Sequence, residues 1–533
     1  MLGSHLTALE SSATCHSFTP VFKVPLLEQS SGRVESWRSI SYQTFREDVE
    51  LCARHWRRIF IGDGIPPRSV IGMWIGGFTY TDVLHIYGIS RAGYIPQLFS
   101  LRLPNPEVIY ELLEKAGAKA LVYESAFEHI LGNCPVTTHS VHDDIDAAEE
   151  TLPDNLNPAA EDIAFIFHTS GSTSGSPKLV PCSFAWLDTV VQKSRQICRP
   201  QTPGRQDVTV WMGSMCHIAQ TFMFIGTLQH GSCVIQPTAI SFSSGELVDM
   251  IHRCGLNRLN QFATFLANHL RASRTDAKLL SLLQGLDEIL YSGLPLAREE
   301  EEWAYRNGLK LRNLFGSTEC GGMLLSVGAS ESGRNPGLLQ PLHGFPYRFV
   351  SIAPAASTSG YQSTARLMEL VIPKESPDCP HVSLRHSDGD FHTGDLFQEA
   401  APGLYTFRGR DDDWIKSENS LRCDTKAIED NAFAMCGNLI DVCVVVGSGR
   451  PSPVMFVEPA VDMDHEKLKK EIIRKTRHFH SRRYLHERIT LADMIIVVPK
   501  HSLPRTATKG NIRRKAVEDA FKTQLDQIYE RVR

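Results

Sequence analysis

The sequence predicts an α/β protein in which helices cover sheets that are rich in parallel strands. Short apolar runs typical of buried strands alternate with longer amphipathic stretches, a pattern that favours parallel sheets packed against helices. The chain has 533 residues, more than one hydrophobic core normally supports, so we expect at least two domains. The expected strands include residues 119–123, 163–167, 208–212, 232–235 and 288–291; residues 51–60 resemble a helix, and residues 70–74 form a further apolar run.

Composition narrows the class of protein. A net charge of -5 and a charged fraction of 22% give no basic bias that would indicate nucleic-acid binding. The 13 cysteines are scattered without closely spaced pairs and no signal peptide is recognisable, so we expect reduced thiols and a cytoplasmic location. No apolar run has the length needed to cross a bilayer, and no membrane partner is expected.

Residues 168–178, with the sequence HTSGSTSGSPK, form the most distinctive segment of the chain. The segment follows the apolar run 163–167, which places it at the carboxyl end of an expected strand, where open α/β sheets bind ligands. Its glycines allow several backbone N–H groups to point into one concavity, its hydroxyls add donors, and Lys178 adds a cation, which together suit a polyphosphate. It is not a Walker P-loop, because no lysine directly follows the second glycine. Taken alone, a flexible polar surface loop is the alternative interpretation.

Three later segments complete the pattern: FGSTE at 315–319, HTGD at 392–395 and GRDD at 409–412. In this order and spacing, the four segments resemble the adenylate-forming superfamily of acyl-CoA synthetases, peptide-synthetase adenylation domains and luciferases. The resemblance extends over nearly the whole chain and includes AGYIP at 92–96.

The resemblance implies a fold and a reaction. It implies an adenylation domain over residues 1–409, with parallel-rich sheets and a small β-barrel-like part, and a smaller mobile α+β domain over residues 410–533. The implied reaction uses ATP and Mg²⁺ to convert a carboxylic acid to an acyl-adenylate with release of pyrophosphate, and then forms a thioester with coenzyme A.

The resemblance also implies which residues bind the nucleotide. The extra Ser174 departs from the usual TSGSTGxPK pattern and leaves the set of phosphate donors open. The implied phosphate-binding residues are Thr169, Ser170, Gly171, Ser172, Thr173 and Lys178. The remaining implied nucleotide-binding residues are Ser292 and Gly293, whose segment flanks the adenine, and Asn313, Phe315 and Gly316, with the Phe315 ring against the adenine.

Four further residues are implied to contact the α-phosphate, the magnesium ion or the ribose. Thr318 corresponds to the donor to the α-phosphate, and Glu319 to the carboxylate that binds Mg²⁺, an ion that prefers hard oxygen ligands. Asp395 corresponds to the ribose-binding carboxylate, because two acceptor oxygens fit two vicinal hydroxyls. Arg410 is implied to support the ribose or a phosphate.

The smaller domain is implied to carry a catalytic lysine and a hinge. Lys509 is the expected catalytic lysine, although the order Lys509-Gly510 inverts the usual Gly-Lys and is closer to fungal peptide-synthetase-like adenylating enzymes. Lys515 is the alternative. Asp412 corresponds to the hinge about which the small domain rotates, and an exposed acid without an energetic role is its alternative interpretation.

The sequence is less informative about the acid and the acceptor. Residues 215–224 contain no acid that could pair with a substrate ammonium, so we expect an acid without an α-amino group. His217 corresponds to a histidine near the carboxylate and the thiol tunnel, with a satisfied core histidine as the alternative. Apolar side chains that suit an aryl or medium acyl group, or equally a packed core, are Phe222, Phe262, Phe265, Leu294 and Met323.

Coenzyme A is the expected thiol acceptor. Only about 19 residues follow Arg514, whereas a fused carrier domain needs roughly 80. The basic stretch 467–488 suits the phosphates of coenzyme A, although a solvated helix face is the commoner explanation of such a run. Two alternatives remain: a stand-alone enzyme that loads a carrier protein in trans, and a catalytically inactive nucleotide-binding relative.

Overall fold

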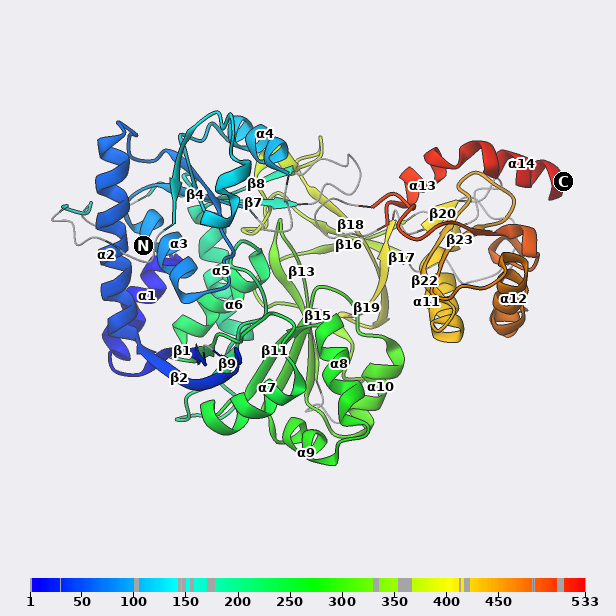
Figure 1. Ribbon diagram of the computed structural model, residues 1–533, viewed down its shortest axis with the longest axis horizontal. Coiled ribbons are helices and arrows are strands. Elements are labelled where there is room, and N and C mark those ends of the chain that lie inside the picture. Colours follow the sequence, from blue (N-terminus) through cyan, green and yellow to red (C-terminus); the bar gives the residue numbers. More distant parts are fainter. Residues whose placement is uncertain are drawn as a thin grey trace.

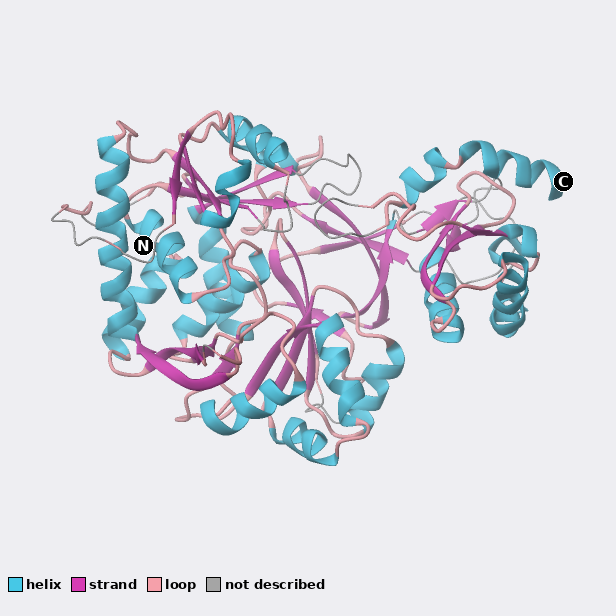
Figure 2. Ribbon diagram, viewed as in Figure 1, coloured by secondary structure: helices cyan, strands magenta, loops and turns pink. Residues whose placement is uncertain are grey.

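The computed structural model confirms the predicted α/β architecture, with a large body and a smaller C-terminal part at one end of it (Figures 1 and 2). The described residues are 2–28, 30–99, 105–141, 145, 150–153, 158–169, 178–328, 335–352, 367–411, 414–416, 422–481, 483, 485–505 and 512–532.

The smaller sheet of the body has the strand order β6-β5-β3-β4-β7-β8. All neighbouring pairs are parallel except β7 and β8, which pair antiparallel. The apolar run at 70–74 forms β3, and the expected strand at 163–167 forms most of β7. The bounds are β3 Val70–Trp74, β4 Ile95–Phe99, β5 Ala120–Tyr123, β6 Thr137–Ser140, β7 Ile163–Thr169 and β8 Lys178–Ser183.

The larger sheet runs in the order β16-β17-β18-β19-β15-β14-β13-β12-β11-β9-β10-β1-β2. Its central strands, from β1 through β10, β9, β11 and β12 to β13, are parallel, as the sequence predicts. The bounds are β1 Pro20–Leu27, β2 Val34–Ser41, β9 Val208–Val210, β10 Cys233–Ile235, β11 Arg258–Phe262, β12 Glu288–Ser292 and β13 Leu311–Ser317, then β14 Gly321–Ser326, β15 Leu339–Pro341, β16 Arg348–Ser351, β17 Leu367–Ile372, β18 Phe391–Ala401 and β19 Leu404–Arg410.

The expected barrel-like part is an open antiparallel extension of this sheet. Strands β14 to β19 pair antiparallel and continue directly from β13, and β16 is the edge strand. In the described part of the chain they form no closed barrel, because β16 pairs only with β17 among the named strands. The expectation of a barrel-like part is therefore corrected to a sheet extension.

Helices fill the space between the two sheets and cover their outer faces (Figure 1). The central core joins residues of α1, α2, α3, α5 and α6 to both sheets, whereas α7 to α10 pack on the outer face of the larger sheet and α4 on that of the smaller sheet. The expected helix at 51–60 lies inside α2. The bounds are α1 His5–Cys15, α2 Tyr42–Gly62, α3 Tyr80–Arg91, α4 Pro106–Ala116, α5 Phe184–Ile197, α6 Ile218–Gln229, α7 Ser244–Asp249, α8 Ala263–Ser273, α9 Ala277–Gly285 and α10 Arg298–Arg306.

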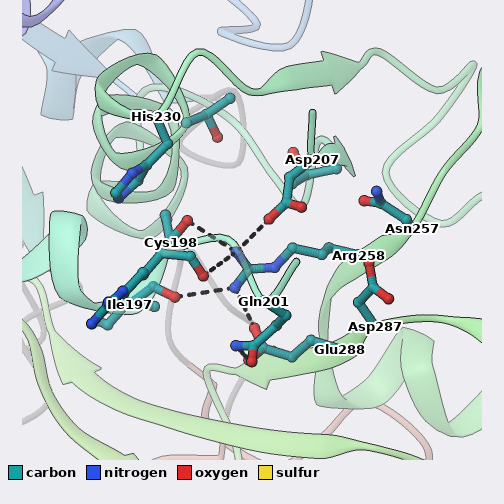
Figure 3. Close-up of polar contacts among 12 residues, drawn as sticks. Ile197, Cys198, Gln201, Asp207, His230, Asn257, Arg258, Asp287 and Glu288 are labelled. Atoms are coloured by element: carbon teal, nitrogen blue, oxygen red, sulfur yellow. Dashed lines mark hydrogen bonds and ion pairs between the residues drawn. The ribbon is translucent and has the colours of Figure 1, made fainter. Parts of the chain in front are cut away.

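A buried polar network lies at the amino ends of the central parallel strands (Figure 3). Arg258, the first residue of β11, is 2% exposed and pairs with Asp207 at 3.0 Å and with Glu288 at 2.5 Å. Its guanidinium also donates to the carbonyls of Ile197 and Cys198, at the end of α5. The network therefore joins the connection between α5 and β9 to the edge of the larger sheet where the parallel strands begin.

The C-terminal part has its own hydrophobic core and two small sheets, β20-β21 and β22-β23-β24. Its bounds are β20 Trp414–Lys416, β21 Arg422–Asp424, α11 Thr425–Cys436, β22 Ile440–Val446, β23 Val454–Pro459, α12 His465–Ser481, β24 Ile495–Val497, α13 Arg514–Ala520 and α14 Lys522–Val532. All thirteen cysteines fall in described residues and are free thiols. Among the described helices, none combines the length and apolar character that a membrane crossing requires.

Candidate functional site

A cleft of about 1450 Å³ lies between the large body and the C-terminal part. Its floor is made at the carboxyl ends of β12 and β13, the edge at which open α/β sheets bind ligands. Segments far apart in the sequence meet here. The residues predicted from the sequence that line it are Thr169, Lys178, Gly293, Leu294, Asn313, Phe315, Gly316, Thr318, Glu319, Asp395, Arg410 and Lys515.

The two ends of the predicted phosphate loop face the cleft. Thr169 ends β7 and Lys178 begins β8, and the two residues are cross-strand partners. Ser170, Gly171, Ser172 and Thr173 lie outside the described residues, so their predicted contacts stay predictions. The predicted loop therefore bridges two antiparallel strands, and the helix α5 follows only after β8.

His168 anchors the start of that loop. Its ring stacks on Phe99 with centroids 4.7 Å apart, Nδ1 lies 2.9 Å from the Leu98 carbonyl, and Nε2 lies 3.2 Å from Nε2 of Gln97. Burial lowers the pKa of His168 to about 4, so the ring is neutral at neutral pH. A neutral ring can donate at Nδ1 and accept at Nε2, which matches both contacts.

The adenine-side segments form the wall between β12 and β13. Gly293 lines the cleft with φ 90°, and an added Cβ there would lie 3.0 Å from the Phe262 ring. Ser292 is 8% exposed and donates to the Leu314 carbonyl at 2.7 Å, so its side chain ties the two strands together and is not among the residues that line the cleft. At Gly316 a Cβ would meet the Gly321 carbonyl oxygen at 2.4 Å, so the β13–β14 hairpin requires glycine there.

Thr318 and Glu319 occupy the turn of that hairpin and face the cleft. The turn is held from α5, because Trp186 Nε1 donates to the Glu319 carbonyl at 3.0 Å. A single carboxylate beside a hydroxyl suits Mg²⁺, which keeps several waters and shares its remaining positions with substrate phosphates. Among the described residues no group of three or more potential ligands forms a closed metal cage. The donor set therefore fits an ion that is bound together with a nucleotide.

Asp395 and Arg410 face each other across β18 and β19, with Asp395 7% exposed. Their nearest charged atoms, Oδ1 and Nη1, lie 3.9 Å apart. Arg410 also donates from Nη2 to the Thr393 carbonyl at 3.3 Å. The carboxylate and the guanidinium therefore reach the cleft as a pair.

Beside this pair lies a charged cluster that sequence reasoning did not single out. His392 contacts Glu369 through Nδ1 and Asp388 through Nε2, each at 3.1 Å. Partial burial opposes the charged imidazolium, but these two carboxylates outweigh it and raise the pKa of His392. The same Glu369 accepts from the Gly394 backbone N–H at 3.1 Å, next to Asp395. His392 begins the HTGD segment at 392–395, whereas Glu369 in β17 stands in no recognisable motif.

The C-terminal wall of the cleft includes Arg513, Arg514 and Lys515 at the start of α13. Lys509 and Asp412 lie outside the described residues, so both assignments stay predictions. The ends of the segment that carries Lys509 are nevertheless fixed, because Arg505 and Ile512 form an antiparallel bridge and the Arg513 N–H donates to the Pro504 carbonyl at 2.9 Å. Ile512 and Arg513, which follow that segment, line the cleft.

The predicted substrate-side residues divide into core and surface. His217 caps α6, with Nδ1 3.3 Å from the Ala219 N–H, and it is not among the described residues that line the cleft. Phe222 and Met323 are 1% and 0% exposed and belong to hydrophobic cores, as in the alternative interpretation. Leu294 is 60% exposed and lines the cleft. Phe262 is half-buried behind Gly293, with its ring 6.1 Å from the His217 ring, and Phe265 is half-buried too.

Comparisons with known proteins agree with the architecture. The family model of AMP-binding enzymes matches residues 24–352, and that of the AMP-binding enzyme C-terminal domain matches residues 412–533. The chain is 35% identical over 520 residues to the AMP-binding domain-containing enzyme iboA of Amanita muscaria, covering 94% of this chain and 98% of that protein. It is 20% identical to the adenylate-forming reductase Nps10 of Heterobasidion annosum, where it covers 92% of this chain but spans only 47% of the relative.

Solved structures show the same fold. The o-succinylbenzoate CoA synthetase MenE from Bacillus subtilis, in complex with an acyl-adenylate intermediate, aligns with a TM-score of 0.75 and 16% identity over 97% of this chain and 98% of that chain. ATP-bound MatB from Rhodopseudomonas palustris aligns with a TM-score of 0.74 and 17% identity, over 98% of this chain and 99% of that chain.

Proposed function

Because the chain belongs to the adenylate-forming superfamily of AMP-binding enzymes, we propose that it activates a carboxylic acid with ATP and transfers the acyl group to a thiol. In the first step a carboxylate oxygen attacks the α-phosphorus, the bond from that phosphorus to the β-phosphate oxygen breaks, and pyrophosphate leaves. In the second step the thiol sulfur attacks the acyl carbon, the acyl–phosphate bond breaks, AMP leaves, and the thiol proton is released.

One observation carries this proposal: residues from four separated segments line a single cleft. The segments contribute Lys178, Thr318 with Glu319, Asp395 and Arg410. The first step brings an anionic acid to an anionic triphosphate, so cations and oriented donors have to surround the reacting atoms. The cleft supplies both kinds of group, and their order along the chain is that of the family's motifs.

Each residue has a proposed task in that step. Thr169 and Lys178 hold the terminal phosphates from the two ends of the loop, Thr318 donates to the α-phosphate, and Asp395 accepts from the ribose hydroxyls. Lys509 neutralises the charge that develops between the carboxylate and the α-phosphate. When bound at Glu319, Mg²⁺ supplies further positive charge to the phosphate oxygens.

We propose an aryl or acyl acid without an α-amino group as the substrate. Residues 215–224, which include the start of α6, contain no acid that could pair with an ammonium. Two of the solved neighbours are named as an o-succinylbenzoate CoA synthetase and an anthranilate CoA ligase, both of which use aromatic acids. That agreement supports the proposed substrate class.

Coenzyme A is the proposed acceptor, with a separate carrier protein as the second candidate. The named CoA synthetases among the structural neighbours favour coenzyme A. The adenylate-forming reductase relatives extend well beyond the part that this chain matches, so a carrier outside this chain stays the second candidate. The basic stretch 467–488 does not decide between the two, because Lys469 and Arg474 on α12 already pair with Glu466 and Glu471.

The test is a measurement of pyrophosphate and AMP release with ATP and Mg²⁺ across benzoate-like, cinnamate-like, fatty and amino acids, with and without coenzyme A. We expect turnover with acids that lack an α-amino group, and a new CoA thioester. An adenylate without a thioester would move the acceptor to a carrier protein. ATP binding without AMP or pyrophosphate for any acid would favour the inactive nucleotide-binding relative and overturn the proposal.

A further inference from the structure

Helix α5 connects the predicted phosphate loop to the turn that carries Glu319. The helix begins directly after β8 (Figure 1), whose first residue is Lys178, and it packs against β14. Trp186 and Lys193 are seven residues apart on α5, which places them two turns apart on one face. Both side chains reach the same short turn of the β13–β14 hairpin.

The two side chains bind two successive backbone carbonyls of that turn. Trp186 Nε1 donates to the Glu319 carbonyl at 3.0 Å, and Lys193 Nζ donates to the Cys320 carbonyl at 2.5 Å. Within the turn, the Cys320 N–H donates to Ser317 Oγ at 3.2 Å. Fixing the carbonyls on both sides of Cys320 fixes the backbone from which the Glu319 side chain projects into the cleft.

Lys193 is held in place by a buried ion pair. Its side chain and that of Asp378 are both 0% exposed, with Nζ and Oδ2 2.8 Å apart. Tyr347 and Ser376 donate their hydroxyls to the same carboxylate, at 2.5 Å and 2.6 Å. The ammonium also lies 5.1 Å from the centre of the Phe345 ring. The Asp378 carboxylate is therefore held by the two hydroxyls as well as by the lysine.

The energetics of such a pair indicate a positional role. Burying two charges costs about as much as their attraction returns, so a buried ion pair is weak evidence for stability. What this arrangement does achieve is direction, because it aims one ammonium proton at the Cys320 carbonyl, one residue from Glu319.

We propose that Trp186 and Lys193 are positioning residues that orient the Glu319 carboxylate for Mg²⁺ and link that orientation to the helix following the phosphate loop. This inference rests on the proposed function only through the assignment of Glu319 to Mg²⁺. Neither residue touches the reacting atoms, and each acts through the backbone of the turn.

The test uses two variants of the full chain. Trp186→Phe removes the indole N–H and keeps an aromatic ring in the core. Lys193→Met combined with Asp378→Asn removes the ammonium without leaving an unpaired buried charge. Calorimetry measures ATP binding with Mg²⁺ and with EDTA, and a Mg²⁺ titration of ATP binding gives the half-saturating concentration. Both measurements are independent of turnover, so they remain informative if no acid is activated.

A matched control lies at the opposite end of the same sheet. Asp207 is also 0% exposed and pairs with a buried cation, Arg258, at 3.0 Å, but it lies at the strand amino ends (Figure 3). Asp207→Asn should lower the thermal midpoint by roughly 2–5 °C, because Arg258 keeps Glu288 but loses one of its two carboxylate partners, and should leave the half-saturating Mg²⁺ unchanged.

We expect Trp186→Phe and the Lys193→Met/Asp378→Asn double variant each to raise the half-saturating Mg²⁺ concentration by roughly 3- to 10-fold, the effect of about one lost hydrogen bond. ATP binding in EDTA should be unchanged. An unchanged half-saturating Mg²⁺ in Trp186→Phe, with only a lower thermal midpoint, would overturn the proposal. So would an equal rise in the Asp207→Asn control. If the double variant does not fold, Trp186→Phe alone decides the outcome.

Discussion

Arg410 lies directly across from Asp395 in the register of β19 and β18, and the nearest atoms of their charged groups are 3.9 Å apart. At that separation the two opposite charges attract each other. The Asp395 side chain is 7% exposed and borders the cleft, and its two acceptor oxygens are suited to two hydroxyl donors. This geometry supports the proposed contact with the ribose.

The first prediction concerns that contact. Asp395→Ala should weaken ATP binding by roughly 10- to 100-fold, because hydrogen bonds to a charged acceptor are among the stronger ones. With 2′,3′-dideoxy-ATP, which lacks both hydroxyls, wild type and variant should bind alike, since the contact is absent in either case. Asp388→Asn is the control, because it neutralises a nearby acid that is not among the residues lining the cleft. An equal loss for both nucleotides would contradict the assignment.

The second prediction separates the two candidate lysines. Lys509→Ala should slow pyrophosphate release by about 100-fold or more, the usual effect of removing a group that stabilises the transition state. Lys515→Ala should slow it only a few-fold, although Lys515 lines the cleft. Lys500→Ala is the control, because that exposed side chain pairs with Asp441 at 2.9 Å. The opposite order of the two variants would assign the catalytic role to Lys515.

The third prediction tests the hinge. Proline fixes φ near −65°, so Asp412→Pro should block a rotation about this residue. We expect pyrophosphate release within a few-fold of wild type and a thioester-forming rate lowered by about 100-fold, measured from supplied acyl-adenylate. Asp412→Ala, which leaves φ free, should retain both steps. Equal loss of the two steps in the proline variant would count against a rotating domain.

The fourth prediction concerns the size of the acid. The Phe262 ring packs closely against two glycines: an added Cβ would lie 3.0 Å from the ring at Gly293 and 2.8 Å from it at Gly213. Phe262→Ala should open the space of this ring to the cleft and raise the ratio of kcat/KM for a bulky acid over a small one by about 10-fold or more. Phe222→Leu is the control, because it removes volume from a side chain that is 1% exposed and should cost stability only. An unchanged ratio in Phe262→Ala would place the acyl group elsewhere.

The sequence predicts the parallel strands and the cleft-facing residues better than the contacts that support them. The runs at 70–74 and 163–167 are recognisable because strands buried on both faces are continuously apolar. Asp395 and Glu319 are recognisable because each stands in a short motif. The antiparallel extension gives no comparable signal, since β16 is largely exposed and the burial of β17 follows no regular alternation.

Contacts made by residues outside the motifs cannot be predicted from the sequence for a different reason. Trp186 and Glu319 are separated by 133 positions, and Lys193 and Asp378 by 185. A lysine on an amphipathic helix is expected to face solvent, because lysines are rarely buried without a partner. The partner of Lys193 is brought to it only by tertiary packing. Ser292 shows the converse: it stands in a motif, but its hydroxyl is used to join two strands.

The last prediction is acid sensitivity from neutral histidines in the core of the large body. Burial lowers the pKa of His5 and of His85 to about 3 in each case. The His5 ring packs against Tyr87 and Phe165 at 4.8 and 4.7 Å, and neither ring nitrogen has a hydrogen-bond partner among the described residues. Both histidines therefore stay neutral in the folded protein over the whole physiological range.

The sign of the effect follows from where protons bind. The unfolded chain takes up a proton on each histidine near pH 6.5, whereas the folded protein does so only near pH 3, so stability is full above pH 6.5 and falls as the pH drops below it. At pH 5 each histidine should cost about 2 kcal/mol of unfolding free energy relative to pH 8. His5→Leu, which keeps an apolar side chain of similar volume, should reduce this loss by the share of one histidine and leave stability at pH 8 equal or higher. Denaturant unfolding at pH 5, 6, 7 and 8 measures the difference, and an identical pH dependence in wild type and variant would contradict the assignment of His5 as a buried neutral ring.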